Sequence, residues 1–413
     1  MKKFVSMLLA LVMVFALCAC GSKTEGGDKA ESKIKVGFIC LHDENSTYDK
    51  NFIDAFEAAC KAKGLKKGQW IIKTGVHEEG SDCKDTAEQF VKLGCKAIFA
   101  DSFGHEDSML EVAKKYPEVQ FCHATGVKAH TENLPNFHNA FASIYEGRYL
   151  AGVAAGLKLQ EMIAANKITD AMKEGENIKI GYVGAYPYAE VKSGYTSWFL
   201  GVRSIVPNVV MKVKFTNEWY SMEKERSTAN YLISEQHCAI ISQHADSMGA
   251  PNACEAAEVP NVSYNGSTAA SCPKTFIVSS RINWQPYFEL MIDAVTGGKA
   301  LPTDWTGNIS TGSVVLTELG AAAAANTQAK IDEVKAKLLN GSLKVFDLST
   351  FTVNGAALVD NFMANVNDDA AFTPDTVVIK TTESGIKYFA ESEFRSAPYF
   401  EVDIDGITII ANN

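Results

Sequence analysis

Two series of short apolar segments alternate with segments of helical spacing, and this alternation constrains the fold more than any other feature of the sequence. The first series opens with IKVGFICL at Ile34, and the second opens with IKIGYVGAY at Ile178. The helical stretches NFIDAFEAACKAKG and CKDTAEQFVKLG end at Gly64 and Gly94, as expected where a helix terminates. Apolar strands that alternate with helices are typical of a parallel sheet covered on both faces. We therefore predict an α/β protein with two Rossmann-like lobes.

The domain boundaries follow from where each series begins and ends. We assign residues 34–143 to a first lobe and residues 144–283 to a second lobe. We expect residues 284–347 to complete the first lobe. Residues 348–413 contain short strand-like runs, among them TVVIKT and ITIIAN, separated by polar turns. We predict that they form a small β-rich C-terminal appendage.

The N-terminus has the layout of a secretory signal. Two lysines precede an apolar run from Phe4 to Ala19, which is shorter than the roughly 20 residues that a membrane-spanning helix needs. The motif LCAC at its end resembles the bacterial lipobox, in which the chain is cut before a cysteine that is then lipidated. We predict a signal peptide over residues 1–19, lipidation of Cys20 and a flexible tether over residues 20–33. These features predict a protein held by lipid on the extracytoplasmic face of the cell membrane; a plain signal peptide is the alternative.

Composition excludes several classes of function. The formal net charge is −10, and no basic cluster is interleaved with aromatic residues, so we expect no nucleic-acid partner. The ten cysteines form no C-x-x-C pair, and neither a phosphate-binding loop nor a G-x-G-x-x-G motif opens either lobe. We therefore expect neither a metal nor a cofactor. Secretion permits disulfides, whereas cysteines in apolar strand-like runs behave as small hydrophobic residues, so both states remain open for the eight cysteines beyond the signal region.

The segments that follow the predicted strands contain the candidate binding residues. Ligands of open α/β sheets bind beyond the carboxyl ends of the strands, so these segments of both lobes should line one cleft. They are rich in aromatic side chains and neutral hydrogen-bonding groups, a mixture that suits a flat heteroaromatic ligand. The candidates are Tyr48, Asn51, Phe103, His123, Tyr188, Trp219, His244, Asp246, Asn265 and Trp284.

The stretch QHADS brings together residue types that also occur in catalytic sites. His244, Asp246 and Ser247 lie within four residues, but the G-x-S-x-G elbow of a serine nucleophile is absent. A carboxylate that binds a ligand needs no such partners, so we interpret Asp246 as a ligand contact and Ser247 as a helix cap. Two other classes stay open: an extracytoplasmic hydrolase or nucleosidase using His244 and Asp246, and a receptor that signals through a membrane sensor.

Several longer stretches carry a family resemblance. These are SFGHEDSMLEVAKKYPEVQFCHATG, YEGRYLAGVAAG, IGYVGAYPYAEVKSGY, TNEWYSMEKE and LNGSLKVFD. From about Lys33 to Asp347 the chain resembles the BMP (basic membrane protein) family of lipoprotein substrate-binding proteins of ABC transporters, which includes PnrA-type purine nucleoside receptors. The resemblance implies a type I periplasmic-binding-protein fold, two lobes joined by hinge strands that close on a ligand without catalysing a reaction. It also implies a transporter permease as partner, and we expect a monomer.

The resemblance assigns roles to some of the candidates. Tyr48 and Asn51 are the nearest match to an aromatic residue and an asparagine that contact the base, and Trp219 matches a second stacking ring. Neutral His123 and Asn265 stand where nucleoside-binding members carry acidic groups. The resemblance therefore implies a purine-type nucleobase or nucleoside, and these two neutral residues favour a free base such as adenine.

Overall fold

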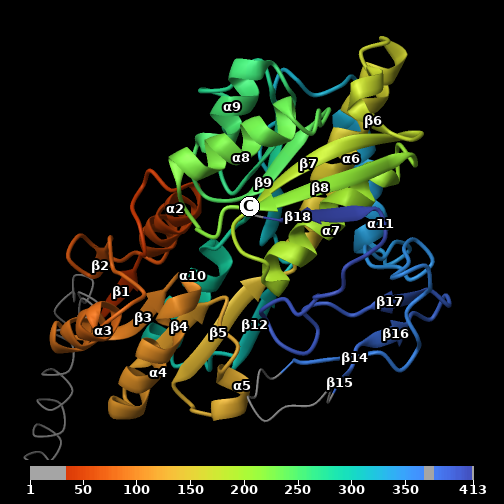
Figure 1. The fold of residues 1–413 in the computed structure, drawn as a ribbon. Helices are drawn as coiled ribbons and strands as arrows, with labels where there is room; N and C mark the ends of the chain where they lie inside the picture. The colour runs from red at the N-terminus through yellow and green to blue at the C-terminus, as the bar shows by residue number, and fades with distance from the viewer. Residues whose placement is uncertain (1–33, 367–375, 412–413) are drawn as a thin grey trace, which may run out of the picture. The chain divides into compact units, whose positions relative to one another are not determined.

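The computed structural model describes residues 34–366 and 376–411. The predicted signal peptide, Cys20 and the tether lie outside the described residues. The described chain contains two large sheets with helices packed against them (Figure 1). Within these ranges no helix is long and apolar enough to cross a membrane.

The first sheet consists of parallel strands in the order β12-β5-β4-β3-β1-β2. Its strands are β1 (Lys35–Ile39), β2 (Trp70–Lys73), β3 (Cys95–Ala100), β4 (Gln120–Ala124), β5 (Phe137–Ala142) and β12 (Asp304–Gly307). Its helices are α2 (Thr47–Ala62), α3 (Asp82–Lys92), the short η1 (Phe103–His105), α4 (Glu106–Lys115), α5 (Ala129–Glu132) and α10 (Gln285–Gly297).

The helix ends predicted at Gly64 and Gly94 are confirmed, and the structure adds a cap at the start of α2. The Ser46 side chain caps α2 by accepting a hydrogen bond from the backbone N–H of Asp49 at 3.2 Å. Gly64 and Gly94 follow α2 and α3 with φ of 74° and 90°, a left-handed conformation that glycine adopts without a steric penalty.

The second sheet has the order β13-β11-β10-β9-β7-β8-β18, with β6 paired to β7. All its pairs are parallel except β11 with β13 and β6 with β7. Its strands are β6 (Lys173–Glu174), β7 (Asn177–Gly184), β8 (Val209–Phe215), β9 (Ile241–His244), β10 (Asn261–Tyr264), β11 (Phe276–Ile282), β13 (Val314–Leu316) and β18 (Ile407–Ile410). Its helices are α6 (Ile144–Ala164), the short η2 (Asp170–Met172), α7 (Ala189–Arg203), α8 (Met222–Ser234), α9 (Gly249–Ala257) and α11 (Thr327–Leu339).

Within the described ranges the chain passes between the two lobes three times. The crossings lie between β5 and α6, between β11 and α10, and between β12 and β13. The prediction that residues 284–347 complete the first lobe therefore needs correction. α10 and β12 belong to the first lobe, but β13 pairs with β11 and α11 packs on α6, both in the second lobe.

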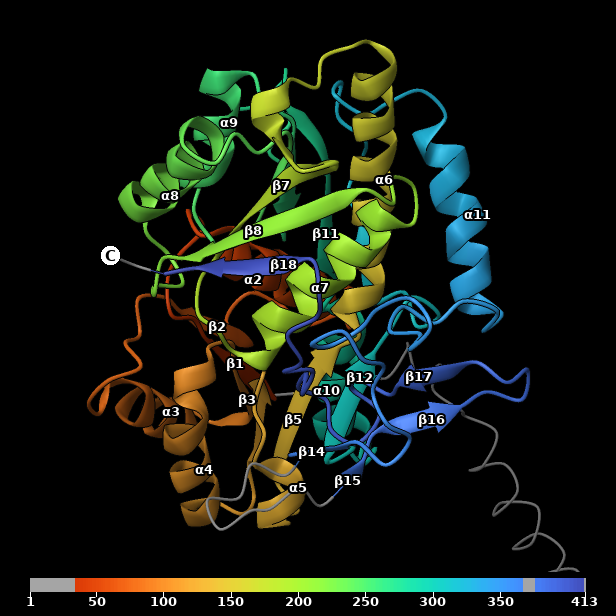
Figure 2. The same cartoon turned by 45° about the vertical axis from the view of Figure 1, so that its right-hand side comes forward.

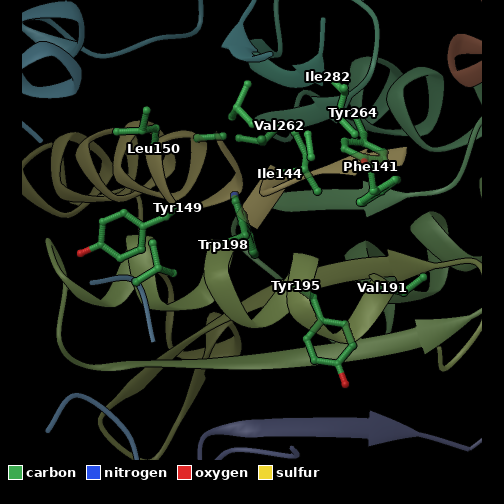
Figure 3. Packing of buried hydrophobic residues seen from close by; sticks show 14 of the residues in the cluster. Phe141, Ile144, Tyr149, Leu150, Val191, Tyr195, Trp198, Val262, Tyr264 and Ile282 are labelled. Atoms are coloured by element: carbon green, nitrogen blue, oxygen red, sulfur yellow. The ribbon is translucent and has the colours of Figure 1, made fainter. Parts of the chain in front are cut away.

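Glycine permits a close approach of α6 to α7 in the second lobe. A Cβ on Gly152 would lie 2.2 Å from the carbonyl oxygen of Trp198, and a Cβ on Gly201 would lie 2.2 Å from that of Tyr149. Trp198 is fully buried beside these glycines, and Figure 3 shows it among Tyr149, Leu150 and Tyr195. Larger side chains at the two glycine positions would separate the helices.

The C-terminal residues do not form a separate β-rich unit. β18 extends the second sheet, with Ile407 opposite Met211, and Figure 2 shows it alongside β8. Ser396 donates from its N–H and its hydroxyl to Asp304 Oδ1 of the first sheet, at 2.9 and 2.7 Å. Before Ser396 lie two small antiparallel strand pairs, β14 (Met363–Ala364) with β15 (Thr376–Val377) and β16 (Ile379–Thr381) with β17 (Lys387–Phe389). The predicted appendage is therefore a segment that contacts both lobes.

The cysteines of the described residues form no disulfides. All eight cysteines there are free and buried, in both lobes. Burial raises the pKa of these thiols, for example to about 12 for Cys122, so they pack as neutral groups.

Candidate functional site

One cavity lies where the carboxyl ends of strands from both sheets meet. Its lining residues follow β1, β3 and β4 of the first sheet and β7, β8 and β9 of the second. It encloses about 380 Å³, part of which is open to solvent. The lining residues are Leu41, His42, Tyr48, Asp49, Ser102, Phe103, Thr125, Glu190, Trp219, His244 and Asp246. This is the position where open α/β sheets bind ligands.

Direct hydrogen bonds connect the two lobes beside this cavity. Thr47, the first residue of α2, donates from its backbone N–H and its hydroxyl to the carbonyl oxygen of Asp246, at 2.9 and 3.2 Å. The Asp246 N–H in turn donates to the carbonyl oxygen of Trp219 at 3.0 Å. The loops after β8 and β9 are therefore tied to the start of α2, so a ligand in the cavity would contact both lobes.

Aromatic rings from both lobes form one part of the wall. The Tyr48 ring lies 4.8 Å from Phe52, and its hydroxyl donates to the carbonyl oxygen of Asp101 at 2.8 Å, which fixes the ring. Trp219 packs edge-on against Tyr186 at 5.1 Å between ring centroids. Phe103 of the first lobe approaches Tyr188 of the second at 5.8 Å. Such rings offer faces for stacking on a flat ligand.

Carboxyl groups form the other part of the wall. The Asp246 side chain is 6% exposed and makes no hydrogen bond with any described residue. Burial raises the pKa of Asp246 well above its ordinary value, and the carboxylates of Asp49 and Glu225 raise it further. Glu190 lies 3.2 Å from Nε2 of His244, whose pKa is lowered by burial, so this imidazole is neutral and donates to the carboxylate.

A second pair of carboxyl groups consists of Asp49, which lines the cavity, and Asp101, which does not. Asp49 Oδ1 accepts the backbone N–H of His42 at 2.7 Å, and Asp101 Oδ1 accepts that of Leu41 at 3.1 Å. Burial, followed by the charge of Asp49, raises the pKa of Asp101 well above its usual range. Asp49, Asp101 and Cys40 place one ligand atom each within 4.8 Å of one another. A proton held on Asp101 accounts for the proximity of two buried carboxyls.

The structure brings five of the ten predicted residues to the cavity wall. These are Tyr48, Phe103, Trp219, His244 and Asp246. Ser247 is not the N-cap of α9, which is Met248; its hydroxyl accepts the N–H of Gly249 at 3.0 Å in the turn that leads into the helix. QHADS thus contributes two wall residues, His244 and Asp246, and a serine that stabilises the turn before α9.

The other five predicted residues do not line the cavity. Asn51 donates to the carbonyl oxygen of Ile282 at 2.7 Å, at one of the crossings between the lobes. His123 is buried, and its Nε2 lies 2.7 Å from the carbonyl oxygen of Ser102, below the wall. Tyr188 is 45% exposed and stacks on Tyr186.

Asn265 and Trp284 also lie outside the cavity lining. Asn265 is buried with a left-handed φ of 63° and donates its backbone N–H to Ser280. Trp284 is 1% exposed and stacks on Phe52 at 4.3 Å, so its ring belongs to the core of the first lobe. Its position after a strand predicted a cleft residue, but the chain turns there into α10 and directs the ring inward.

The sequence predicts the loops that line the cavity, but not every residue of those loops that faces it. Asp49, Thr125 and Glu190 line the cavity and lie in segments that follow predicted strands, but they were not singled out. The usable signal was position: each lies within about ten residues of a strand's carboxyl end. An acidic residue in the first turn of a helix is usually solvent-exposed, which concealed Asp49 and Glu190.

The fold resembles that of solute-binding proteins of known structure. A solute-binding protein of an ABC transporter from Aeropyrum pernix superposes with a TM-score of 0.62 over 76% of this chain and 93% of its own, at 15% identity. Another from Conexibacter woesei gives a TM-score of 0.58 over 75% of this chain and 98% of its own, at 19% identity. The predicted type I periplasmic-binding-protein fold is confirmed.

Residues 36–349 match the family described as ABC transporter substrate-binding protein, PnrA-like, and the chain belongs to that family. It is 32% identical over 289 residues to a purine-binding protein of Brucella abortus, covering 69% of this chain and 75% of the relative. It is 31% identical over 271 residues to a putative ABC transporter glucose-binding protein of Haloferax volcanii, covering 66% and 64%. Members of this family bind solutes on the extracytoplasmic side for an ABC transporter.

Proposed function

We propose that this chain is a lipid-anchored receptor that binds a purine-type nucleobase or nucleoside in the cavity and delivers it to an ABC transporter permease. The observation that carries the proposal is the wall itself: rings of Tyr48, Phe103 and Trp219 lie around an unpartnered buried carboxyl group, Asp246. The faces of a purine stack on such rings, while its edge supplies donors and acceptors for the polar groups.

The comparisons support the ligand class in this proposal. The relative from Brucella abortus is named a purine-binding protein, and it shares about a third of its aligned residues with this chain. The named glucose-binding relative makes a sugar the second candidate, because aromatic rings and carboxylates also suit sugar hydroxyls. Which of the two fills the cavity is therefore the first question for experiment.

The mechanism of capture is closure of the two lobes. A ligand that contacts Tyr48 in the first lobe and Asp246 in the second stabilises the arrangement in which Thr47 bonds to Asp246. Because this contact requires both lobes to be close, the ligand shifts the population towards the closed form. The permease would then recognise the closed form, and Cys20 lipidation would keep the receptor at the membrane.

Isothermal titration of ligand-free protein tests the proposal. The panel is adenine, adenosine, guanosine and hypoxanthine, with D-glucose as the sugar alternative. We expect at least one purine to bind with a Kd of about 10 μM or tighter, near −7 kcal/mol. The proposal is wrong if no purine binds below about 1 mM, and binding of glucose alone would replace it by the sugar receptor.

A further inference from the structure

The hydroxyl groups of the cavity wall already donate to protein acceptors. Tyr48 donates to the carbonyl oxygen of Asp101, Ser102 to the carboxylate of Glu78, and Thr125 to the carbonyl oxygen of Ala124. A ligand with acceptor groups therefore finds none of these three protons available without breaking an existing bond. No lysine or arginine is among the lining residues.

The wall also contains carboxyl oxygens that are free to accept a hydrogen bond, beside the ring nitrogens of His42, Trp219 and His244. The Asp246 side chain has no hydrogen-bond partner among the described residues. Asp49 is not part of this free capacity, because the proton held on Asp101 faces its carboxyl group and Nδ1 of His42 lies 3.4 Å from its Oδ2. The Glu190 side chain is 13% exposed and is held by His244 through one oxygen, leaving the other available.

A buried acceptor without a donor costs free energy, and a ligand that supplies the donor recovers that cost. We infer that the cavity selects purines that carry an exocyclic amine, with the amine hydrogens directed at Asp246 and its neighbouring carboxyl groups. This inference rests on the proposed purine-binding function and specifies which purines the site prefers. A purine with only a carbonyl at the same position would direct an acceptor at the carboxyl oxygens of Asp246 and Glu190.

Amine-for-hydrogen pairs isolate the effect, because the ring stays constant. Adenine is compared with unsubstituted purine, and guanine with hypoxanthine, by competition titration on the refolded full-length protein. In at least one pair we expect the amine to tighten binding by about tenfold or more, the size of one hydrogen bond to a buried acceptor. Adenine should also bind more tightly than hypoxanthine.

Variants connect this preference to the wall. Asp246→Asn, which keeps the shape and removes an acceptor, should reduce the amine preference to about threefold or less. Glu190→Gln serves the same purpose if Asp246→Asn does not fold by circular dichroism and thermal melting. The matched control is Asp54→Asn, an exposed carboxylate on α2 paired with Lys50, which should leave the preference unchanged.

The possible results distinguish failure of the proposed purine binding from failure of the proposed amine preference. Failure of every purine to bind to folded protein contradicts the proposed function. Binding of purines without any amine preference, or with hypoxanthine tighter than adenine, overturns the inference and leaves the proposed function standing. A preference that persists in both Asp246→Asn and Glu190→Gln also overturns it.

Discussion

Replacing Trp219 by alanine removes one of the two rings expected to hold the ligand. Trp219 lines the cavity, is half-buried, and is kept upright by the edge-on contact with Tyr186 at 5.1 Å. Stacking of a base on an aromatic side chain contributes about 1–3 kcal/mol when measured by alanine substitution. A loss of about 2 kcal/mol corresponds to a Kd about 30-fold weaker.

Isothermal titration of Trp219→Ala, Trp219→Phe and the control Trp70→Ala measures this effect. Trp219→Phe keeps a smaller ring and should lose less than Trp219→Ala. Trp70 lies on β2, outside the cavity lining, so its variant should bind with unchanged affinity. If Trp219→Ala binds within twofold of the unmodified protein while remaining folded, Trp219 does not stack on the ligand and the aromatic wall has been misread.

Three further predictions concern the anchor, a buried acid and the helix packing. Cys20→Ser should abolish incorporation of radiolabelled palmitate and release the protein from membranes, and continued labelling would refute lipidation at Cys20. Burial raises the pKa of Glu391 to about 7 from a usual 4.5, so the folded state keeps a proton that the unfolded state releases. The contribution of this group to stability should therefore be greatest below about pH 4.5 to 5 and should fall as the pH rises towards 7. The Glu391→Gln variant should show a smaller fall in Tm over this range. An unchanged profile of Tm against pH would exclude Glu391 as the source of the fall. Gly201→Ala should lower the free energy of unfolding in urea by about 1–3 kcal/mol, because the new Cβ would meet the Tyr149 carbonyl oxygen. The control Gly297→Ala has nothing within 4 Å of its Cβ and should leave the free energy of unfolding unchanged. Equal effects of the two variants would show that close packing of α6 against α7 is not the cause.

Local patterns in the sequence predicted the strands and the loops that line the cavity. Apolar runs such as IKVGFICL and IKIGYVGAY became β1 and β7, and the rule for strand ends then placed the binding loops of both lobes. Both signals are local, since each requires only a run of residue types and the direction of the chain after it.

Features that depend on distant pairing could not be predicted. β18 lies about two hundred positions from its partner β8, and nothing in ITIIAN specifies Met211 as its neighbour. Trp284 follows a strand as Trp219 does, yet its ring meets Phe52 on a helix more than two hundred residues earlier. Which side chains face the cavity depends on such distant contacts, whereas the location of the cavity at the strand ends does not.

The most direct test of the account is a crystal structure of the protein with the tightest-binding purine of the titration panel. We expect the purine ring between Tyr48 and Trp219, with a polar edge within hydrogen-bond distance of Asp246. A ligand bound outside the cavity formed by the ends of β1, β3, β4, β7, β8 and β9, or a ring that contacts neither Tyr48 nor Trp219, would contradict it.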